Sequence, residues 1–476
     1  MEQIKILVGD RLVSATDEMV GVIESGGRLL ALRRSGEVLA VPADVVSTVD
    51  SAVSRAVEAF QHLQIVPPSA INAFFSRFAD LLGDENVFGP VLAANRDDVS
   101  KAKALGRATG RLELTAKMRA DMIGGLRMWA ELPLDRLERT DVVDHGDWSV
   151  ESWRSPLGVV AFVFEGRPNV FADATGVLKT GNTVVFRIGS DALGTARAIR
   201  DRLLVPALRD AGLPEGSVQL VDSPERSAGW ALFDDPRLAL AVARGSGPAV
   251  GQLGEVARQA GVPVSLHGTG GAWLIVGRKF DSDRLGAIIE HSLDRKVCNT
   301  LNTLVLTDES FEDSLRVVRV SLGAVARRHG GKVTVHAGDS SIERGLAADE
   351  HLEVIADAPD PGIEWEWDSL PELTVIRARN VKAGVESFNR HSPRFVLSVC
   401  TSDASEEDAA WFESDAPFFG DGFTRWVDGQ FALGRPELGL ANWQFGRLLG
   451  RGGVLSGDGV HTVRLRVRQR SADLHR

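Results

Sequence analysis

The pattern of apolar and polar positions divides the chain into three stretches with different periods. Residues 1 to about 43 alternate short apolar runs with glycine turns, and the run 20–32 predicts a β hairpin. From about 44 to 135, apolar residues recur at helical spacing, as at Val49, Val53 and Val57, which predicts amphipathic helices. Beyond that, apolar strands alternate with glycine-containing turns and helices, and this order predicts a parallel sheet covered on both faces.

The strand candidates of the last stretch are continuous apolar runs, so the predicted fold class is α/β. They cover residues 158–164, 183–187, 218–221, 239–243, 273–276, 303–306, 332–335, 373–376 and 395–399, with helices at 173–178 and 193–211. Two polar, strand-like stretches, 147–153 and 462–468, stand outside this rhythm. The alternation of Val463, Leu465 and Val467 indicates that another element covers one face, and a two-stranded flap that pairs with a second subunit would explain both stretches.

Length, charge and cysteine content narrow the class of protein. A chain of 476 residues exceeds what one hydrophobic core normally serves, which predicts two or three domains with a shared cleft. The net charge is −11, from 54 basic and 65 acidic residues, and without a basic tract nucleic acid is not an expected partner. The chain has no apolar run long enough to predict a membrane-spanning segment. Only two cysteines occur, which favours a reducing, cytoplasmic compartment.

The first candidate for chemistry is Cys298, because its sequence setting is polar and basic. Arg295 and Lys296 precede it and Asn299 follows it, and cationic neighbours favour the thiolate, the form that attacks carbonyl carbon. The alternative is that the thiol is simply a small buried hydrophobe, as most lone cysteines are. Cys400, at the end of the apolar run 395–400, fits that alternative well.

Two turns after apolar strands are candidates for binding a nucleotide. Arg244, Gly245, Ser246 and Gly247 precede a helix, where backbone amides can receive a phosphate and glycine permits close approach. A simple connection between strand and helix explains that turn equally well. Arg187 and Gly189 likewise end a strand with a cation and a glycine, which suits a ribose or a phosphate. Neither turn matches the GxGxxG fingerprint.

A third turn, 165–170, carries the amide side chain of Asn169 just before a predicted helix. That amide could donate a hydrogen bond to an oxyanion. It could equally cap the helix, a position that asparagine favours. Sequence spacing does not decide between the two roles, because Asn169 and Cys298 are about 130 residues apart and only a fold could bring them together.

Taken together, these segments resemble the gamma-glutamyl phosphate reductases, also called glutamate-5-semialdehyde dehydrogenases, of the aldehyde dehydrogenase superfamily. The matching runs are SPLGVV at 155–160, EGRPNV at 165–170, LKTGNTVVFR at 178–187, RGSG at 244–247, VCN at 297–299 and TRWVDGQFALG at 424–434. The resemblance extends in order from about residue 45 to the C-terminus. Six ordered matches are far more specific than any one of them.

The resemblance implies an aldehyde dehydrogenase-like fold with two parallel-sheet α/β domains and a β oligomerisation flap. The expected divisions are an N-terminal β segment at 1–43, a cofactor-binding domain at 44–262 with 142–154 contributing to the flap, and a catalytic domain at 263–432. Residues 433–476 then return to the cofactor domain and supply the last flap strand. A homodimer or a dimer-based oligomer is the implied assembly.

The resemblance also implies NADPH-dependent reduction of an acyl phosphate, glutamyl-5-phosphate or a relative, to the semialdehyde. Cys298 would form a thioester, and Asn169, with the backbone amide of Cys298, would hold the oxyanion. The implied cofactor-binding residues are Arg187, Gly189, Arg244, Gly245, Ser246, Gly247 and Glu366, and the implied substrate-binding residues are Arg167, Asn299 and Arg425. No metal is expected.

Three departures from the family pattern bear on the substrate. Leu266 stands where oxidising relatives carry the glutamate that activates water, so the thioester should wait for hydride or another acceptor in preference to water. Asn302 stands where the family usually has glutamate, and the N-terminal β segment is extra. His267 could be a substitute base, although a structural role is more common. Two alternatives remain open: a coenzyme A or carrier-protein thioester as the acyl donor, and a catalytically silent subunit.

Overall fold

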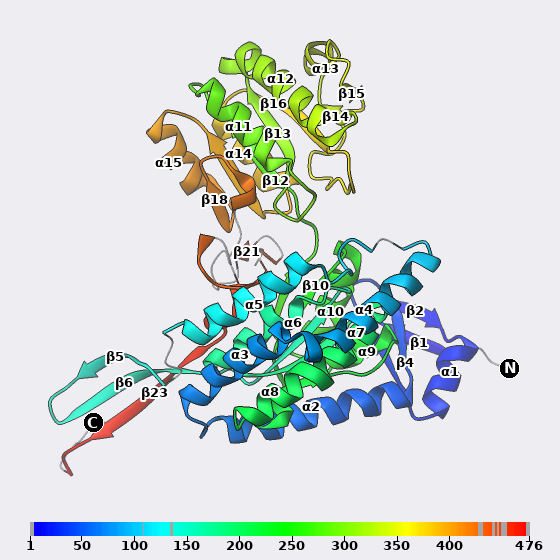
Figure 1. Cartoon of the computed structure of the whole chain (residues 1–476), viewed down its shortest axis with the longest axis vertical. Coiled ribbons are helices and arrows are strands. Elements are labelled where there is room, and N and C mark those ends of the chain that lie inside the picture. The colour runs from blue at the N-terminus through cyan, green and yellow to red at the C-terminus, as the bar shows by residue number, and fades with distance from the viewer. Residues whose placement is uncertain are drawn as a thin grey trace. The chain divides into compact units, whose positions relative to one another are not determined.

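The computed structural model describes residues 4–107, 109–133, 137–426, 432–439, 443–444, 447–448 and 455–472. It divides into two compact units. Unit 1 comprises Met1–Gly268, Gly434–Leu438 and Leu455–Arg476, and unit 2 comprises Thr269–Leu433 and Gly439–Val454. Each unit contains a parallel sheet with helices, so the predicted α/β class is confirmed (Figure 1).

The core of unit 1 is a five-stranded parallel sheet in the order β11-β10-β7-β8-β9. Successive residues of its central strand point to opposite faces, so Val160 and Phe162 join one apolar cluster while Val159 and Ala161 join another. The strands are β7 (Val159–Phe164), β8 (Thr183–Ile188), β9 (Val218–Leu220), β10 (Leu238–Arg244) and β11 (Val264–His267). This double burial explains why their sequences are continuously apolar.

Different helices of unit 1 cover the two faces of that sheet. One cluster includes residues of α3 (Pro68–Gly83), α4 (Glu85–Ala104), α5 (Ala116–Glu131), α6 (Val170–Ala174), α7 (Leu193–Ile199) and α8 (Val205–Asp210). The other includes residues of α2 (Ala43–Leu63), α9 (Ser227–Phe233) and α10 (Gly247–Gln259). The helix expected at 173–178 begins earlier, as α6, and continues as the 3-10 helix η1 (Thr175–Thr180).

The N-terminal segment differs from its prediction. Strands β1 (Lys5–Val8) and β2 (Arg11–Ser14) form one hairpin, β3 (Arg28–Ala31) and β4 (Val38–Val41) form another, and helix α1 (Asp17–Glu24) lies between them. The hairpin expected over 20–32 was therefore wrong. The side chain of Thr16 accepts a hydrogen bond from the Met19 amide and caps the helix, and two acidic residues in the first turn suit its positive end.

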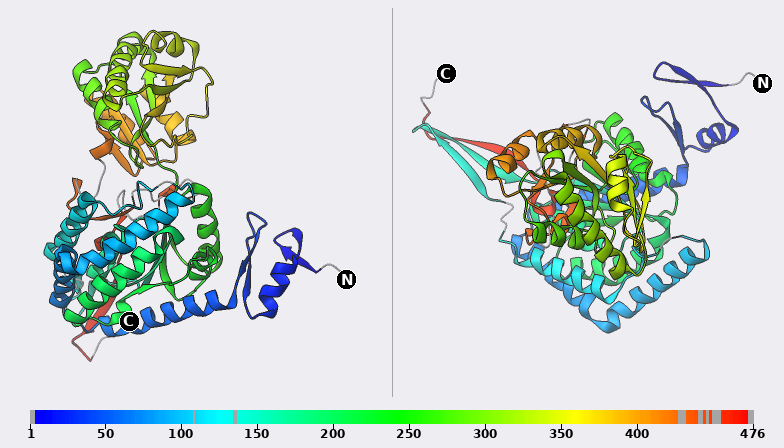
Figure 2. Two further views of the ribbon diagram at one scale, coloured as in Figure 1. Left: turned by 45° about the vertical axis from the view of Figure 1, so that its right-hand side comes forward. Right: turned by 90° about the horizontal axis from the view of Figure 1, so that it is seen from above.

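The second hairpin is hydrogen-bonded to α10. The Arg34 amide donates to Glu255 (2.6 Å), and the Arg33 amide donates to Gln259 (2.9 Å). Figure 2 shows the segment beside the start of α2, to which β4 leads directly. These bonds connect the extra segment to the helix that follows the 244–247 turn.

The two polar stretches outside the α/β rhythm do form strands, and they pair with each other. Strand β23 (Thr462–Gln469) runs antiparallel to β6 (Trp148–Ser155), and β5 (Arg139–Asp144) is added on the other side of β6 (Figure 1). The flap thus has three strands where the sequence predicted two. Strand β5 escaped prediction because all six of its residues are exposed, so it carries no buried apolar pattern.

The Asn182 side chain helps to join the C-terminal segment to the core of unit 1. The Asn182 side-chain oxygen accepts from the amides of Leu157 (2.7 Å) and Gly158 (3.0 Å), and its nitrogen donates to the Val460 carbonyl (2.7 Å). Nearby, Gly457 packs directly against the backbone of Gly176, where no side chain would fit. The segment 457–460 is thereby fixed against η1.

Unit 2 is built on a seven-stranded parallel sheet in the order β15-β14-β16-β13-β12-β17-β18. The strands are β12 (Ala272–Val276), β13 (Leu301–Thr307), β14 (Val333–Ala337), β15 (Leu352–Ile355), β16 (Glu372–Ala378), β17 (Val396–Cys400) and β18 (Phe418–Gly420). Its helices are α11 (Ser282–Ser292), α12 (Phe311–His329), α13 (Ser340–Leu346), α14 (Val381–His391) and α15 (Ala404–Glu413). Among the described helices of both units, none has the length and apolar character needed to span a membrane.

Candidate active site

The candidate residues of unit 1 gather at one edge of its sheet. Strands β7, β8, β10 and β11 are parallel, so the turns that follow them all lie at the carboxyl edge. The Gly189 amide donates to the Phe164 carbonyl (3.0 Å), and the Gly245 amide donates to the His267 carbonyl (3.2 Å). The structure therefore brings the 165–170, 187–189 and 244–247 segments to the edge where α/β proteins bind ligands.

Asn169 occupies the N-cap position of α6, but its side chain makes no capping hydrogen bond. Its Nδ2 instead donates to the Asp173 carboxylate at 3.0 Å. The capping alternative is thus wrong for the side chain. An amide carries two N–H donors, and this bond orients the group while using one of them.

Arg167 belongs to a small cluster of charges. Its Nε lies 2.6 Å from the Glu165 carboxylate, which also lies 3.4 Å from Nη1 of Arg111. The Arg167 side chain is one-quarter exposed. Because Glu165 balances its charge, Arg167 is held in place by its own turn.

The 244–247 turn leads into α10. Ser246 is the N-cap residue, and its side chain makes no capping hydrogen bond. The first amides of the helix therefore lack a side-chain acceptor from that residue, an arrangement that favours an anion. The turn is packed tightly, because a Cβ on Gly268 would lie 3.0 Å from the Cα of Gly247.

His267 and Leu266 lie on β11, beside this turn. Burial, with a smaller contribution from Arg244, lowers the pKa of His267 to about 3. The ring is therefore neutral, and its Nε2 lies 2.9 Å from the Ser265 hydroxyl. Leu266 packs on the apolar cluster of α10. A buried histidine with so low a pKa is a poor general base, so neither residue replaces the missing carboxylate.

In unit 2, Cys298 lies in a short loop between α11 and β13 and is half-buried. The Thr300 hydroxyl accepts from the Val297 amide (2.9 Å) and donates to the Arg295 carbonyl (2.7 Å), which closes the loop on itself. The Cys298 carbonyl accepts from the Gly271 amide (2.8 Å). These bonds fix the backbone that carries the thiol.

Gly270 lies against the cysteine. A Cβ on Gly270 would lie 2.9 Å from the Cα of Cys298 and 2.7 Å from its carbonyl oxygen. Only glycine allows this approach. The Gly270 amide donates a hydrogen bond to the Glu364 carboxylate at 2.6 Å. This bond holds Gly270 against Cys298.

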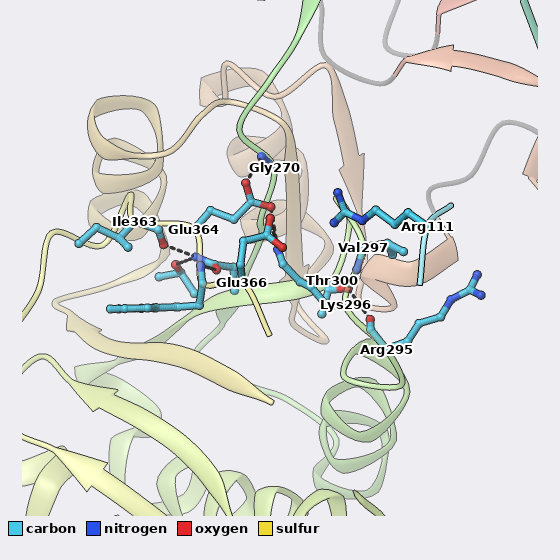
Figure 3. A network of polar contacts seen from close by, with 12 residues as sticks. Arg111, Gly270, Arg295, Lys296, Val297, Thr300, Ile363, Glu364 and Glu366 are labelled. Atoms are coloured by element: carbon cyan, nitrogen blue, oxygen red, sulfur yellow. Dashed lines mark hydrogen bonds and ion pairs between the residues drawn. The ribbon is translucent and has the colours of Figure 1, made fainter. Parts of the chain in front are cut away.

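The sequence suggested that Lys296 favours the thiolate of Cys298. In the structure its charge is paired with carboxylates. Its Nζ lies 2.7 Å from Glu364 and 3.9 Å from Glu366, and its side chain is only 5% exposed. Figure 3 shows this network, with the Arg295 guanidinium pointing away from it. The cation that the sequence places two residues before Cys298 is thus balanced by a carboxylate 68 positions later in the chain.

Asn302 is a donor where the family pattern suggests a carboxylate. Its Nδ2 donates to the Ile363 carbonyl (2.8 Å), and its Oδ1 accepts from the Trp365 amide (2.9 Å). Asn302 is buried at 4% exposure. It therefore fixes the segment that carries Glu364, and a carboxylate could not make the bond to Ile363.

The structure brings the Asn299 and Arg425 side chains together. Nη1 of Arg425 donates to the Asn299 side-chain oxygen, and Nε lies 2.7 Å from Asp294. Arg425 is mostly buried. Residues 427–431 of the 424–434 motif lie outside the described residues.

Glu366 is the most exposed of the candidate residues in unit 2. Its side chain is 62% exposed, against 13% for Glu364. The residue that the sequence analysis missed is Glu364. The alternation of Glu364, Trp365, Glu366 and Trp367 was a possible signal, because it places two carboxylates on one side of an extended segment.

Cys400 ends strand β17 inside an apolar cluster. Burial raises the pKa of its thiol to about 11. The interpretation of Cys400 as a buried hydrophobe is confirmed. Within the described residues, no three histidine, cysteine or acidic side chains are grouped in a way that could hold a metal ion.

Comparison with known proteins adds the family. The sequence profile described as "Aldehyde dehydrogenase family" matches residues 33–316, more than half of the chain. The chain belongs to the aldehyde dehydrogenase family. Within that family it falls in the gamma-glutamyl phosphate reductase branch, as the ordered motifs predicted. It is therefore an oxidoreductase.

The similar proteins and solved structures match most of the length of this chain. A gamma-glutamyl phosphate reductase from Rhodopseudomonas palustris (strain BisB18) is 31% identical over 371 residues, 75% of this chain and 80% of its own. The crystal structure of gamma-glutamyl phosphate reductase from Thermotoga maritima superposes with a TM-score of 0.77 at 24% identity, covering 90% and 100%. A Rhodopseudomonas palustris propionaldehyde dehydrogenase with bound CoA and an acylated cysteine has a TM-score of 0.64 at 16% identity, covering 90% and 98%.

Proposed function

We propose that this aldehyde dehydrogenase-family enzyme reduces an acyl phosphate, glutamyl-5-phosphate or a close relative, to the aldehyde through a thioester on Cys298. The observation that carries the proposal is the fixed loop in which Thr300, Gly270 and Gly271 hold the backbone of a half-buried thiol. A nucleophile held in one geometry loses little entropy on reaction. The names of the similar proteins supply the substrate class.

In the proposed reaction the Cys298 thiolate attacks the carbonyl carbon of the acyl phosphate, a C–S bond forms, and the C–O bond to phosphate breaks. NADPH, when bound by the residues proposed below, would supply a hydride for the reduction of the thioester carbon to the aldehyde. Cys298 then departs as thiolate and is ready for another cycle. We assign Asn169 the oxyanion-stabilising role, for which its bond to Asp173 orients the amide.

Several residues of unit 1 fit a dinucleotide. Arg187 has a buried Nε without a hydrogen-bond partner among the described residues, and α10 begins without a side-chain cap. We propose that the cofactor is held by Arg187, Gly189, Arg244, Gly245, Ser246, Gly247 and Glu366. We also propose that the substrate is bound by Arg167, Asn299 and Arg425. The ion pair with Glu165 orients Arg167, and a mutual hydrogen bond orients Asn299 and Arg425.

The reductive direction is supported by the residue at position 266. Leu266 packs into an apolar cluster and His267 is neutral and buried, so neither offers a base for activating water. A thioester formed on Cys298 would therefore be consumed by hydride or by another acceptor. Coenzyme A is the principal alternative acceptor, because the related propionaldehyde dehydrogenase was solved with bound CoA.

We further propose a dimer-based assembly formed through β23. Its apolar residues Val463, Leu465 and Val467 are 51%, 68% and 56% exposed within one chain. Such alternation on a strand is typical of a face that another surface covers. Both cysteines are free, which supports the proposed cytoplasmic location.

The reverse reaction tests this function. Purified protein is mixed with glutamate-5-semialdehyde and NADP+, with either phosphate or coenzyme A, and NADPH formation is followed by absorbance. We expect turnover that requires phosphate, and we expect Cys298→Ala to abolish it while NADP+ still binds. Cys400→Ala, the matched control, should keep most of the activity because that thiol has no part in the reaction. Turnover that requires coenzyme A would replace acyl phosphate by a thioester donor. No turnover and no nucleotide binding would indicate a silent subunit.

A further inference from the structure

Segment 361–366 of unit 2 has no helix or strand of its own, so side chains of the neighbouring sheet satisfy part of its backbone. The Thr303 hydroxyl donates to the Pro361 carbonyl (2.9 Å), and Asn302 bonds to two further backbone groups of the segment. Both side chains belong to β13, the strand that follows the Cys298 loop. The segment is therefore fixed to the strand that continues from the thiol.

Trp365 fixes the same segment to two further strands. Its indole nitrogen donates to the Thr374 hydroxyl of β16 (2.8 Å). Its ring stacks on the His336 imidazole of β14, with ring centres 3.7 Å apart and an angle of 3° between the planes. Thr374 is the register partner of both Thr303 and His336, so these three residues form one row across β13, β16 and β14. Register partners point to the same face of a sheet, and Trp365 docks on that face.

The surface that receives the indole is held rigidly. Nδ1 of His336 lies 2.9 Å from the Asp357 carboxylate, and its Nε2 lies 2.8 Å from the Glu372 carboxylate. Contacts at both ring nitrogens fix the plane of the imidazole. His336 is 4% exposed and Thr374 is fully buried. Trp365 thus docks on groups that have little freedom to move.

Glu364, the residue before Trp365, contacts the Cys298 loop instead of the row. Its carboxylate accepts a hydrogen bond from the Gly270 amide (2.6 Å) and lies 2.7 Å from Nζ of Lys296 (Figure 3). Gly270 in turn packs directly on the backbone of Cys298. A chain of contacts therefore runs from the docked indole, through one carboxylate and one glycine, to the residue that carries the thiol.

We propose that Trp365 is a positioning residue for the Cys298 thiol. Its docking on the row sets where the Glu364 carboxylate lies, and thereby where Gly270 packs against Cys298. The inference rests on the proposed reaction at this thiol. A displacement of a reacting group by about 1 Å can lower a rate by about a hundredfold, so the docking controls turnover as well as stability.

The first test compares turnover in folded variants, with glutamate-5-semialdehyde, NADP+ and phosphate. Trp365→Leu removes both the stack and the hydrogen bond, and its kcat should fall by about tenfold or more because the thiol is misplaced. Its KM for the semialdehyde should change by less than about twofold, since the groups that bind substrate remain. Trp365→Phe keeps the stack and loses only the bond to Thr374, so its kcat should fall by about fivefold or less. Trp411→Leu, at a half-exposed tryptophan of α15, is the matched control and should resemble the wild type.

The second test does not require the reaction. Cys400→Ala leaves Cys298 as the only cysteine, and its alkylation by iodoacetamide is followed by mass spectrometry well below the melting temperature of each variant. In this background Trp365→Leu should react at least about threefold faster, because a half-buried thiol on a released loop is more accessible. Glu364→Gln should give a similar increase. The double variant should not exceed the larger single effect, because both changes act on the same contact.

Three results would overturn the inference. One is unchanged alkylation in a folded Trp365→Leu protein, and another is unchanged kcat in that protein when the wild type turns over. The third is additive effects of Trp365→Leu and Glu364→Gln, because Trp365 would then not act through Glu364. If Trp365→Leu does not fold, Trp365→Phe and Thr374→Val, which remove the same hydrogen bond from opposite sides, decide by the same measurements. A protein without turnover, but with faster and non-additive alkylation, would leave the positioning role standing and the proposed reaction rejected.

Discussion

Lys296 of unit 2 and Arg187 of unit 1 are both partly buried cations, but their surroundings differ. Lys296 is balanced within its own unit by Glu364 at 2.7 Å. Arg187 faces a second cation, Arg226, and its Nε lacks a partner within the described residues. The first arrangement serves to position a loop, because its charge is already used. The second leaves a buried N–H donor without an acceptor, which an anionic ligand would supply.

His267 shows a third treatment of a buried basic group. It lies on β11 beside Arg244, and burial lowers its pKa to about 3, so the ring remains neutral. The three basic side chains are thus accommodated in different ways. Lys296 is paired with a carboxylate, Arg187 has a donor left for a ligand, and His267 is unprotonated. Each treatment has a different cost when it is disturbed.

The largest effect on stability should come from breaking the ion pair between Lys296 and Glu364. Glu364→Gln removes the carboxylate 2.7 Å from Lys296, whose side chain is 5% exposed. Leaving a buried cation with only the more distant Glu366 should lower the free energy of unfolding of unit 2 by about 3 kcal/mol, measured by urea denaturation. Glu366→Gln is the matched control. Its carboxylate is 62% exposed, and solvent screening should limit the loss to about 0.5 kcal/mol. Equal losses would contradict the assignment of Glu364 as the structural partner.

An intermediate effect on stability is expected when the pH is lowered, because His267 is unprotonated in the folded protein. The folded pKa of His267, about 3, lies below its ordinary value of 6.5, so between these values the unfolded chain binds a proton that the folded chain does not. Stability should therefore fall as pH falls below 6.5, and this group should account for about 2 kcal/mol of loss at pH 5. His267→Gln should remove that part of the pH dependence in urea titrations at pH 7 and pH 5. His62→Gln, at an exposed position of α2, should leave it unchanged. An unaltered slope in His267→Gln would reject the account.

The smallest effect on stability should come from replacing Arg187, which we propose binds a ligand. Arg187→Met removes a buried cation that repels Arg226, at the cost of one hydrogen bond to Glu225. The two terms oppose each other, so the free energy of unfolding without nucleotide should change by less than about 1 kcal/mol. Lys296→Met is the sharp contrast, because it leaves Glu364 buried without its cation and should cost about 3 kcal/mol. An Arg187→Met protein as destabilised as Lys296→Met would remove the distinction.

Most strands of the two parallel sheets were predicted, because burial on two faces requires continuous apolar runs, and a run such as 159–164 has few other interpretations. The short strands β11, β15 and β18 were not among the predicted runs. The N-terminal helix α1 was not predicted either. Its residues Val20 to Ile23 look like a strand, and the Thr16 cap outweighed that local preference. Strand β5 was missed for the opposite reason, since an exposed strand that is stabilised by pairing to β6 has no apolar period of its own.

The candidate site residues were proposed from the sequence, whereas their hydrogen-bond and ion-pair partners could not be. Arg295 and Lys296 suggested a positive setting for Cys298, but the balancing Glu364 comes from a segment far along the chain. Asn302 looked like a lost carboxylate, yet it donates to Ile363 and thereby fixes that segment. Local sequence reports neighbours within a few residues. Charge balance and hydrogen-bond direction depend on contacts that only the fold creates.

The hydrogen bond from Asn182 to Val460 bears on the order in which parts of the chain can reach their native structure during synthesis. Unit 2 contributes residues 269–433, which leave the ribosome before the segment that carries Val460. Until that segment arrives, the Asn182 nitrogen lacks the Val460 carbonyl as an acceptor at 2.7 Å, and η1 lacks its contact with Gly457. Because N-terminal parts normally fold first, unit 1 is expected to remain open at this point and to close last. The enzyme's first-formed sheet would then be the last to become fully native.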